Sequence, residues 1–513
     1  MASARIAIVG FGPRGLGALE RLIAHQGTPA STPIEVTIFE PHPTPGAGSA
    51  YDPHQPPFLL MNFPVAKIDL NWKAEGPPSC FESGPFSEWA GVDPARAERW
   101  YPPRALVGRY LSAAAAELID SCPFPVELLP ESVLGMEPES RGWLVRSDSR
   151  KSRFDEVLLA VGHAPRRSTA TRTSDLAEAG SRVGIRGFGL TAIDLILQLT
   201  EGRGGQFESG EGEALRYSRT GSEPSMIVPS SRHGRPMVVK PELARSRAQE
   251  EILLTAIEGS RDQVLQLPFG SGINQLGTVI ASLCAELLSS KGAQAEAENW
   301  IQAAFNGRLE PISDPAGAIA RSLRIASGKT DPDLSWALGL AWRSIYPAIV
   351  ERFSHGSLLE ADYVPFRSLA AELERLAFGP PPVNGEKLLA LVEAGILDLS
   401  RLAEAGSGRT DTELDAVTEP PGLLLHQMPL ADLVAEGAIR VPAGARGIEV
   451  TRAARCVGAD GETTQGLAAC GRLTEDWVIG NDTLDRSLHP EIDRWAATIC
   501  AGTQAEPAVA VVS

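Results

Sequence analysis

The sequence has few of the features that mark secreted, membrane-spanning or metal-binding proteins. Its six cysteines are scattered, and none forms a Cys-x-x-Cys or another close pair, which disfavours zinc ribbons and dithiol redox sites. No apolar run reaches the roughly 18 residues that a spanning helix needs. The amino-terminus leads directly into the strand-like Ile6–Gly10 and not into a secretory leader. We therefore expect a cytoplasmic protein with reduced thiols and no bound metal.

Positive charge is also in deficit. The chain has 47 Lys and Arg residues against 64 Asp and Glu residues, a formal net charge of −17. Binding to nucleic acid or to an anionic membrane depends on Lys and Arg neutralising negative charge. We expect neither partner, and the chemistry of small molecules becomes the default.

The length of 513 residues predicts two or three domains. Apolar periodicity alternates between strand and helix near both ends of the chain, whereas the middle is dominated by helical periodicity. This pattern predicts an α/β fold with two Rossmann-like dinucleotide-binding units and a largely helical inserted domain. The predicted boundaries are 1–175 and 441–513 for the first unit, 176–240 for the second unit, and 241–440 for the insertion.

The first glycine-rich turn reads Gly-Phe-Gly-Pro-Arg-Gly and lies between a strand and a helix. Gly10 suits the tight exit from the strand, Gly12 lets the backbone approach a pyrophosphate, and Gly15 lets the helix pack closely. Pro13 and Arg14 open the helix, whose N-terminus favours an anion. All five residues are predicted to contact a dinucleotide.

An acidic residue follows at the end of the next strand. Glu40 closes Ile34–Phe39, 25 residues after Gly15. A carboxylate in this place accepts hydrogen bonds from the hydroxyls of an adenosine ribose. Glu40 is therefore a predicted ribose ligand.

Two later segments favour FAD over NAD at this first site. Glu156–Val161 is a hydrophobic strand that ends in glycine, and Trp477–Ile479 is interpreted as a further strand that ends in Gly and Asp near a ribityl chain. Pro45–Gly48 is a flexible loop that could pass under the isoalloxazine ring of FAD. The cofactor contacts predicted from these segments are Gly162, His163, Gly480 and Asp482.

A second glycine-rich turn begins after the strand that starts at Arg182. It has the pattern G-x-G-x-x-A, with Gly187, Gly189 and Thr191 as predicted cofactor contacts. Where a ribose 2′-hydroxyl acceptor would stand, the chain instead has Ser231 and Arg232. Arginine suits a 2′-phosphate, so we predict NADPH. The alternative is a degenerate half-unit used only for packing.

Together these residues resemble the FAD/NAD(P)-binding family of bacterial flavoproteins, which is related to the flavin-dependent N-hydroxylating monooxygenases of ornithine, lysine and aspartate. The matching motifs are Gly10–Gly15, Gly46–Tyr51, Leu60–Asn62, Pro103-Arg104 with Gly108–Leu111, Val161–His163, Gly187–Thr191, Ser231–Gly234 and Phe378–Pro381. One departure is Ala-Val-Gly-His at 160–163, where those enzymes more often have Ala-Thr-Gly.

The resemblance implies that NADPH reduces FAD, that O₂ adds to form a flavin C4a-hydroperoxide, and that a small amine such as an amino acid attacks it. Asn62 and Arg104 are the candidate catalytic residues, for contact with the flavin or with a substrate carboxylate. The other interpretations are a flavin oxidase or dehydrogenase of a small amine or amino acid, and a non-catalytic nucleotide-binding protein. A dithiol reductase is disfavoured by the missing cysteine pair. Whether the protein is a homo-oligomer stays open.

Overall fold

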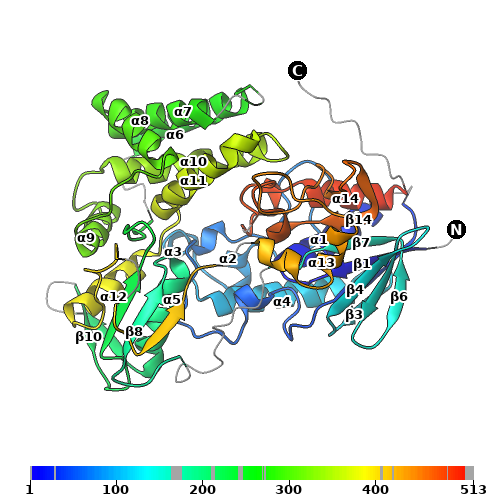
Figure 1. The fold of residues 1–513 in the computed structure, drawn as a ribbon, viewed down its shortest axis with the longest axis horizontal. Coiled ribbons are helices and arrows are strands. Elements are labelled where there is room, and N and C mark those ends of the chain that lie inside the picture. The colour runs from blue at the N-terminus through cyan, green and yellow to red at the C-terminus, as the bar shows by residue number, and fades with distance from the viewer. Residues whose placement is uncertain are drawn as a thin grey trace.

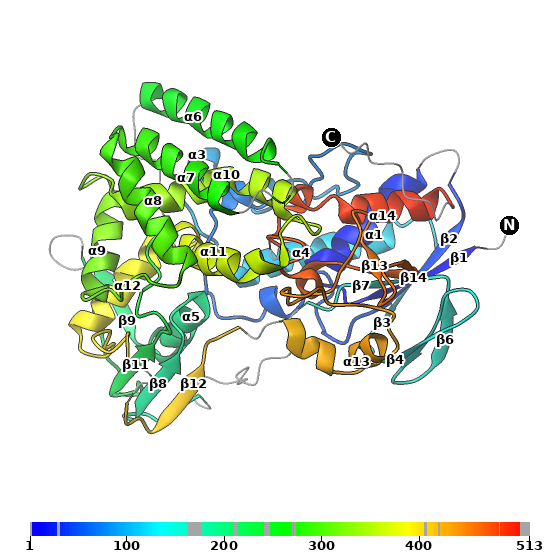
Figure 2. The same ribbon diagram turned by 45° about the horizontal axis from the view of Figure 1, so that its top comes forward.

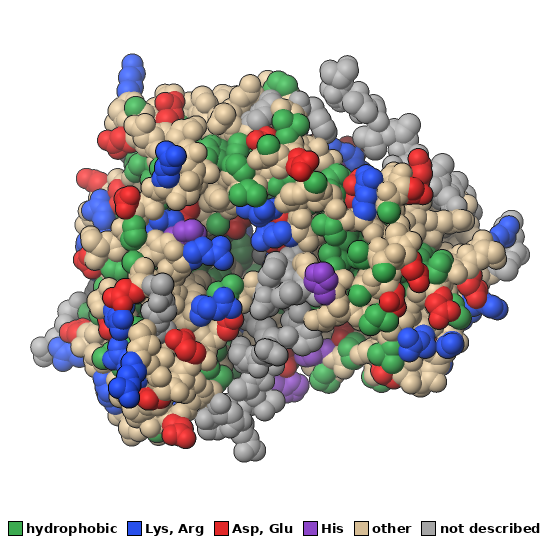
Figure 3. Space-filling view, viewed as in Figure 1, with side chains coloured by type: hydrophobic (Ala, Val, Ile, Leu, Met, Phe, Trp, Pro, Cys, Tyr) green, Lys and Arg blue, Asp and Glu red, His purple; other side chains and the backbone are tan. Residues whose placement is uncertain are grey.

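The computed structural model describes residues 3–27, 31–162, 176–209, 214–240, 247–268, 270, 273–404, 408–418, 421–481 and 483–502. These residues form a large sheet with its helices, a smaller sheet, and a layer of long helices (Figure 1). Basic and acidic side chains are interspersed on the face shown in Figure 3. Of the helices in the described ranges, none is both long and apolar enough to cross a membrane.

The first unit is built on a six-stranded sheet in the order β13-β14-β7-β1-β2-β3. Its strands are β1 (Ala4–Val9), β2 (Ile34–Phe39), β3 (Val126–Leu129), β7 (Glu156–Leu159), β13 (Arg455–Val457) and β14 (Thr463–Ala469). Because β1 pairs in parallel with both β2 and β7, its Ile6, Ala7 and Ile8 side chains are fully buried. Strands from both ends of the chain therefore complete one sheet.

Helices cover this sheet (Figure 2), and a small antiparallel sheet packs against it through a shared buried cluster that includes Phe39 and Phe154. The main covering helices are α1 (Pro13–Gln26), α4 (Arg104–Asp120) and α14 (Glu491–Cys500), with the short α2 (Phe86–Trp89), α3 (Pro94–Ala97) and α13 (Leu430–Ala435). The antiparallel sheet consists of β4 (Val133–Pro138), β5 (Trp143–Ser147) and β6 (Lys151–Phe154). α1 packs along α14, which ties the two ends of the chain together.

The second unit has a three-stranded parallel sheet, β11-β8-β12, and the helix α5. The bounds are β8 (Arg182–Arg186), α5 (Leu190–Leu199), β11 (Met226–Ser230) and β12 (Thr412–Asp415), with a hairpin of β9 (Gln206–Ser209) and β10 (Leu215–Ser218) and the helix α12 (Pro382–Glu393) beside them. Figure 2 shows β12 next to β8. The sheet therefore extends beyond the predicted range 176–240, because β12 comes from the range assigned to the insertion.

The middle of the chain is helical, as predicted. Its helices are α6 (Arg247–Leu265), α7 (Ile273–Leu288), α8 (Gly292–Phe305), α9 (Pro315–Ala326), α10 (Leu334–Phe353) and α11 (Tyr363–Ala377). They share one buried apolar cluster that includes Trp336 and Trp342. The predicted α/β class with two Rossmann-like units and a helical part is confirmed.

One predicted strand is wrong. Trp477–Ile479 lies in turns, and the strand that pairs with β7 is β14, which is followed by Cys470 and Gly471. The apolar segment is buried without pairing: Val478 and Ile479 are 5% and 8% exposed, and the Trp477 indole N–H donates to the Val450 carbonyl at 2.7 Å. Burial alone therefore produced the apolar pattern that resembled a strand.

Candidate active site

The turn between β1 and α1 requires glycine at two places for steric reasons. Gly10 has φ +93°, and a Cβ there would lie 2.5 Å from the Ala160 carbonyl oxygen. A Cβ on Gly15 would lie 2.3 Å from the carbonyl oxygen of Gly10. The first glycine thus permits the turn, and the third lets α1 pack against it.

The second glycine leaves room for a ligand. A Cβ on Gly12 would have only the Gly48 Cα within 4 Å, at 3.8 Å. Gly12 is the N-cap of α1 and makes no side-chain capping bond, so the first-turn N–H groups, which start after Pro13, can bind an anion. Gly46 holds the loop beside this space by donating its N–H to the Phe11 carbonyl at 2.7 Å. These residues fit the pyrophosphate of FAD.

Glu40 is fixed next to this turn. Its side chain is 8% exposed; Oε2 accepts the Phe11 N–H at 2.6 Å and Oε1 accepts the His42 N–H at 2.8 Å. A carboxylate oxygen has more than one acceptor site. Glu40 can therefore keep both backbone bonds and still accept from ribose hydroxyls.

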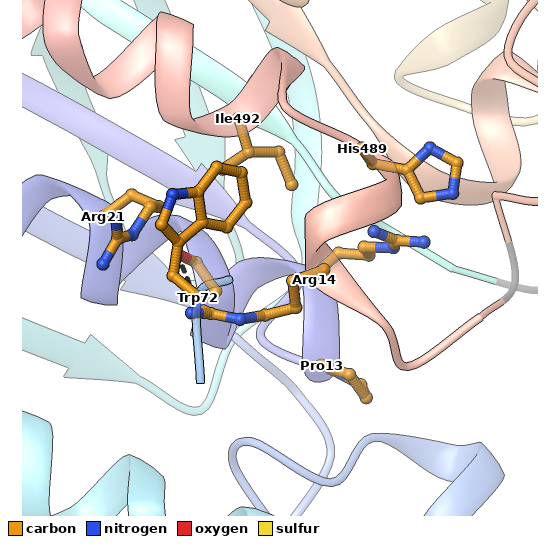
Figure 4. Close-up of a pocket in the computed structure, with 8 residues that line it drawn as sticks. Pro13, Arg14, Arg21, Trp72, His489 and Ile492 are labelled. Carbon is orange, nitrogen blue, oxygen red and sulfur yellow. Dashed lines mark hydrogen bonds between the residues drawn. The ribbon is translucent and has the colours of Figure 1, made fainter. Parts of the chain in front are cut away.

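Arg14 connects the start of α1 to the carboxy-terminal segment. Its guanidinium donates to the carbonyls of Asn481 and Thr483 at 2.9 and 3.1 Å. Arg14 also lines a pocket with Trp72 and His489, where Figure 4 shows the three side chains together with Ile492. A second pocket, also lined by Arg14, reaches Cys470, Gly471 and Glu491.

The remaining residues predicted near FAD are spread over two places. Gly162 follows β7 with φ +68° and open space around its Cβ position. Gly480 lies in a turn, where its carbonyl oxygen is 2.8 Å from His489 Nε2 and a Cβ would lie 2.9 Å from the Tyr346 ring. His163 and Asp482 lie outside the described residues.

The turn between β8 and α5 repeats the first turn with one change. Gly187 has φ +106°, and a Cβ on Gly189 would meet nothing within 4 Å. The third position holds Ala192, whose side chain is fully buried. Thr191 lies in the first turn of α5. This turn too has space for a phosphate group at the N-terminus of a helix.

The loop after β11 contains two arginines that differ in how far they are buried. Arg235 is 7% exposed and forms a bidentate ion pair with Glu372 at 2.8 and 2.9 Å. Arg232 is exposed, and its neighbour Ser231 donates its N–H to the Leu402 carbonyl at 2.8 Å. Burial and the charge of Arg235 lower the pKa of His233. Arg232 is thus the arginine of this pair that a 2′-phosphate could reach.

Asn62 and Arg104 lie where the two units meet. The Asn62 side-chain amide donates to the Phe378 carbonyl at 3.2 Å, and Lys240 donates to the Asn62 carbonyl at 2.6 Å. Arg104, at the start of α4, forms an ion pair with Asp194 of α5. Its Nε is buried and hydrogen-bonds no described residue. Arg104 therefore faces the second unit, whereas the Asn62 side chain contacts Phe378, which packs against the helical layer.

Comparison with known proteins agrees with this geometry. Residues 7–164 match the family model described as FAD-NAD(P)-binding. This segment is therefore similar to FAD-NAD(P)-binding domains. The match supports the predicted binding of FAD and of NAD(P), and the relatives described next agree with the prediction of an FAD-dependent oxidoreductase.

Three relatives resemble a larger part of the chain. Nitrosuccinic acid synthase npaA of Aspergillus oryzae is 28% identical and aligns with 77% of this chain and 73% of its own length. An L-aspartate N-monooxygenase (nitrosuccinate-forming) of Streptomyces cremeus is 27% identical, with coverages of 77% and 74%. The enzyme of the same name from Streptomyces davaonensis is 30% identical over 50% of this chain and 48% of its own.

The first unit also contains a buried charge cluster that the sequence did not indicate. Glu20 is fully buried and contacts Arg21 at 2.6 Å and Arg486 at 2.8 Å. Burial alone would raise the pKa of Glu20, but the hydrogen bond from Arg21 and the charge of Arg486 lower it. Arg486 is 466 residues away, so no local spacing could reveal this contact.

A second buried pair joins the helical layer to this unit. His355, just after α10, lies 2.7 Å from Glu491 at the start of α14. Burial would raise the pKa of Glu491, but the hydrogen bond from His355 and the charge of His489 lower it to about 2. The helical layer is thus fixed next to the pocket that Glu491 lines.

No set of three or more His, Cys, Asp or Glu side chains in the described ranges is placed to hold a metal ion. Cys470, which lines the second pocket, has an unreactive thiol, because burial raises its pKa to about 12. A protonated thiol is a poor nucleophile at neutral pH.

Proposed function

We propose that the chain is an NADPH-driven monooxygenase that hydroxylates the amine of a small amino acid, with L-aspartate as the first substrate to test. The reaction balances as R–NH₂ + O₂ + NADPH + H⁺ → R–NHOH + H₂O + NADP⁺. The relative named as an L-aspartate N-monooxygenase supports this choice of substrate, since its alignment covers 77% of this chain and 74% of that enzyme.

One observation carries the proposal: two glycine-rich turns, each with open space at a helix N-terminus, lie in units that meet at Asn62 and Arg104. An enzyme that moves electrons from one dinucleotide to another needs both sites and a common junction. A single-nucleotide sensor would need only one of these turns.

The residues of the chain then have distinct roles. FAD, when bound, supplies electron transfer and oxygen activation. The first turn of α1 binds its pyrophosphate, and Glu40 accepts its ribose hydroxyls. Gly189 and Arg232 bind the pyrophosphate and the 2′-phosphate of NADPH. Arg104 can present guanidinium N–H groups to a substrate carboxylate, because Arg binds carboxylates through paired hydrogen bonds.

Small-molecule substrate and O₂ are the partners that this reaction requires. We further propose that the protein is cytoplasmic. The net charge of −17 supports the proposal that it binds neither nucleic acid nor membrane.

The test is anaerobic mixing of the purified flavoprotein with NADPH and, separately, NADH, followed by addition of air with and without L-aspartate. We expect faster bleaching of the flavin by NADPH and an N-oxygenated product by mass spectrometry. Aspartate should also lower the yield of H₂O₂ per NADPH consumed.

Two results would overturn the proposal. Flavin that neither nucleotide reduces would favour an oxidase or a binding protein. Reduction of the flavin by NADPH without any N-oxygenated product from a panel of amino acids would contradict the monooxygenase assignment. The protein would then be assigned as an NADPH-dependent oxidoreductase of another kind.

A further inference from the structure

The two nucleotide-binding units meet near Phe58 and the start of α4. Phe58 of the first unit packs against the apolar core of the second unit. Near it, the Arg104 N–H donates to the Leu59 carbonyl at 2.8 Å, and Leu60 forms a β-bridge with Pro103. The start of α4 is therefore tied to the segment that enters the second unit.

From this position Arg104 reaches across to α5. Its ion-pair partner Asp194 is the fifth residue of the helix whose first turn is the predicted NADPH phosphate site. The side chains of Arg104 and Asp194 are 24% and 15% exposed. Solvent screens a pair at this depth less than it screens a surface pair, and its geometry is directional.

We propose that Asp194 is a positioning residue: by holding Arg104, it sets the place of α5, and hence of bound NADPH, relative to the FAD unit. This inference rests on the proposed function. Asp194 is not expected to touch either nucleotide, and it acts through the guanidinium of Arg104.

The physical reason is that electron transfer between nucleotides is sensitive to alignment. A displacement of about 1 Å in a reacting pair costs on the order of 10²-fold in rate, even when binding is unchanged. An ion pair that joins α4 to α5 resists sliding of one unit past the other. Loss of the pair should therefore affect the rate of flavin reduction more than the affinity for NADPH.

The position of Arg104 itself agrees with this role. Its Nη2 contacts Asp194, whereas its buried Nε bonds no described residue. A guanidinium held at one end by a carboxylate keeps its other donors in a fixed direction. Asp194 would thus also orient the donors that the proposed function assigns to the substrate.

The experiment compares Asp194→Asn with the wild-type flavoprotein by anaerobic stopped flow over a range of NADPH concentrations. We expect the limiting rate of flavin reduction to fall at least tenfold, with Kd for NADPH within about twofold and an unchanged FAD content. Asp194→Glu, which keeps the charge but lengthens the side chain, should recover part of the rate.

Glu139→Gln is the matched control. It removes a carboxylate from the Arg153–Glu139 pair, which lies inside one antiparallel sheet of the first unit. This variant should reduce at the wild-type rate. A wild-type rate in Asp194→Asn would overturn the inference.

Two further outcomes are separable. If Asp194→Asn does not fold, Asp194→Ala takes its place: a limiting rate equal to that of the wild type would contradict the positioning role. A wild-type protein that NADPH does not reduce would instead overturn the proposed function on which the inference rests.

Discussion

The two glycine-rich turns solve the same packing problem with different third residues. In the first turn, Gly15 leaves α1 so close that an added Cβ would overlap the Gly10 carbonyl oxygen at 2.3 Å. In the second, Ala192 is accommodated and fully buried. The first helix, α1, is thus packed more tightly against its turn. Its residues Glu20 and Arg21 also form a buried charge cluster with Arg486. The second helix is fixed mainly by apolar packing and by the pair at the junction.

The same contrast appears in the polar groups near each turn. Glu40 ends β2 and is locked by two backbone N–H groups, whereas the corresponding loop after β11 has an exposed arginine. From this comparison we expect a tightly held cofactor in the first unit and an exchangeable one in the second. Four substitutions test this contrast, taken from the largest expected effect to the smallest.

Gly15→Ala should abolish FAD retention. The new Cβ would overlap a backbone oxygen that cannot move without opening the turn. The ratio of flavin to protein absorbance, with the Tm, measures the loss. The matched change in the second unit, Ala192→Gly, should cost only about 1 kcal/mol of stability. Equal FAD content in Gly15→Ala and wild type would break the comparison.

Glu20→Ala should destabilise the first unit by about 3–5 kcal/mol, because it leaves buried arginines without their carboxylate. The pKa of Glu20 is lowered in the folded state from its ordinary value of 4.5, so the stabilisation by Glu20 is present above that pH and is lost as the pH falls below it. Urea unfolding at pH 7 and pH 4 would show the difference between variant and wild type shrinking in acid.

The control for that measurement is Glu35→Ala. Glu35 is 43% exposed and pairs with Arg5 on the surface, so its loss should cost less than about 1 kcal/mol. A cost for Glu20→Ala as small as that of the control would show that the charge cluster does not hold α1.

Glu40→Ala should weaken FAD binding by about 1–3 kcal/mol, or roughly 10- to 100-fold in Kd, because two backbone donors lose their acceptor. FAD titration of the apoprotein followed by flavin fluorescence measures this. Glu40→Gln keeps one acceptor oxygen and should bind with intermediate affinity. An unchanged Kd for FAD in both variants would show that Glu40 does not bind the ribose.

Arg232→Ala should raise the KM for NADPH about tenfold and leave the KM for NADH unchanged, since only NADPH has the 2′-phosphate. Steady-state kinetics with both nucleotides provides the test. Arg235 is no suitable control because its burial makes it structural. Exposed Arg219 lies in the same unit, and Arg219→Ala should leave both KM values unaltered. A parallel rise with NADH would indicate a fault in folding rather than in phosphate recognition.

Local patterns allowed much of the fold and both turns to be predicted. Gly10, Gly12, Gly187 and Gly189 occupy the places that their spacing predicts, because a strand, a tight turn and a helix are all local. β12 was missed because Thr412–Asp415 is a four-residue, half-exposed strand with no apolar signature.

Long-range contacts account for the rest. Trp477–Ile479 resembles a strand in its composition, but burial in turns produces the same pattern. The partners of Arg104 and Glu20 come from distant parts of the chain, and a pair such as Glu20 and Arg486 has no spacing that periodicity could detect. Their roles become visible only when the units are placed together.

The order of strands in the first sheet has a consequence for synthesis on the ribosome. β7 is complete by residue 159, but its neighbour β14 begins at residue 463. Throughout the translation of the intervening residues, β7 presents an unpaired edge of the kind that promotes association between chains. We therefore expect this edge of β7 to stay exposed on the nascent chain until its last strands emerge.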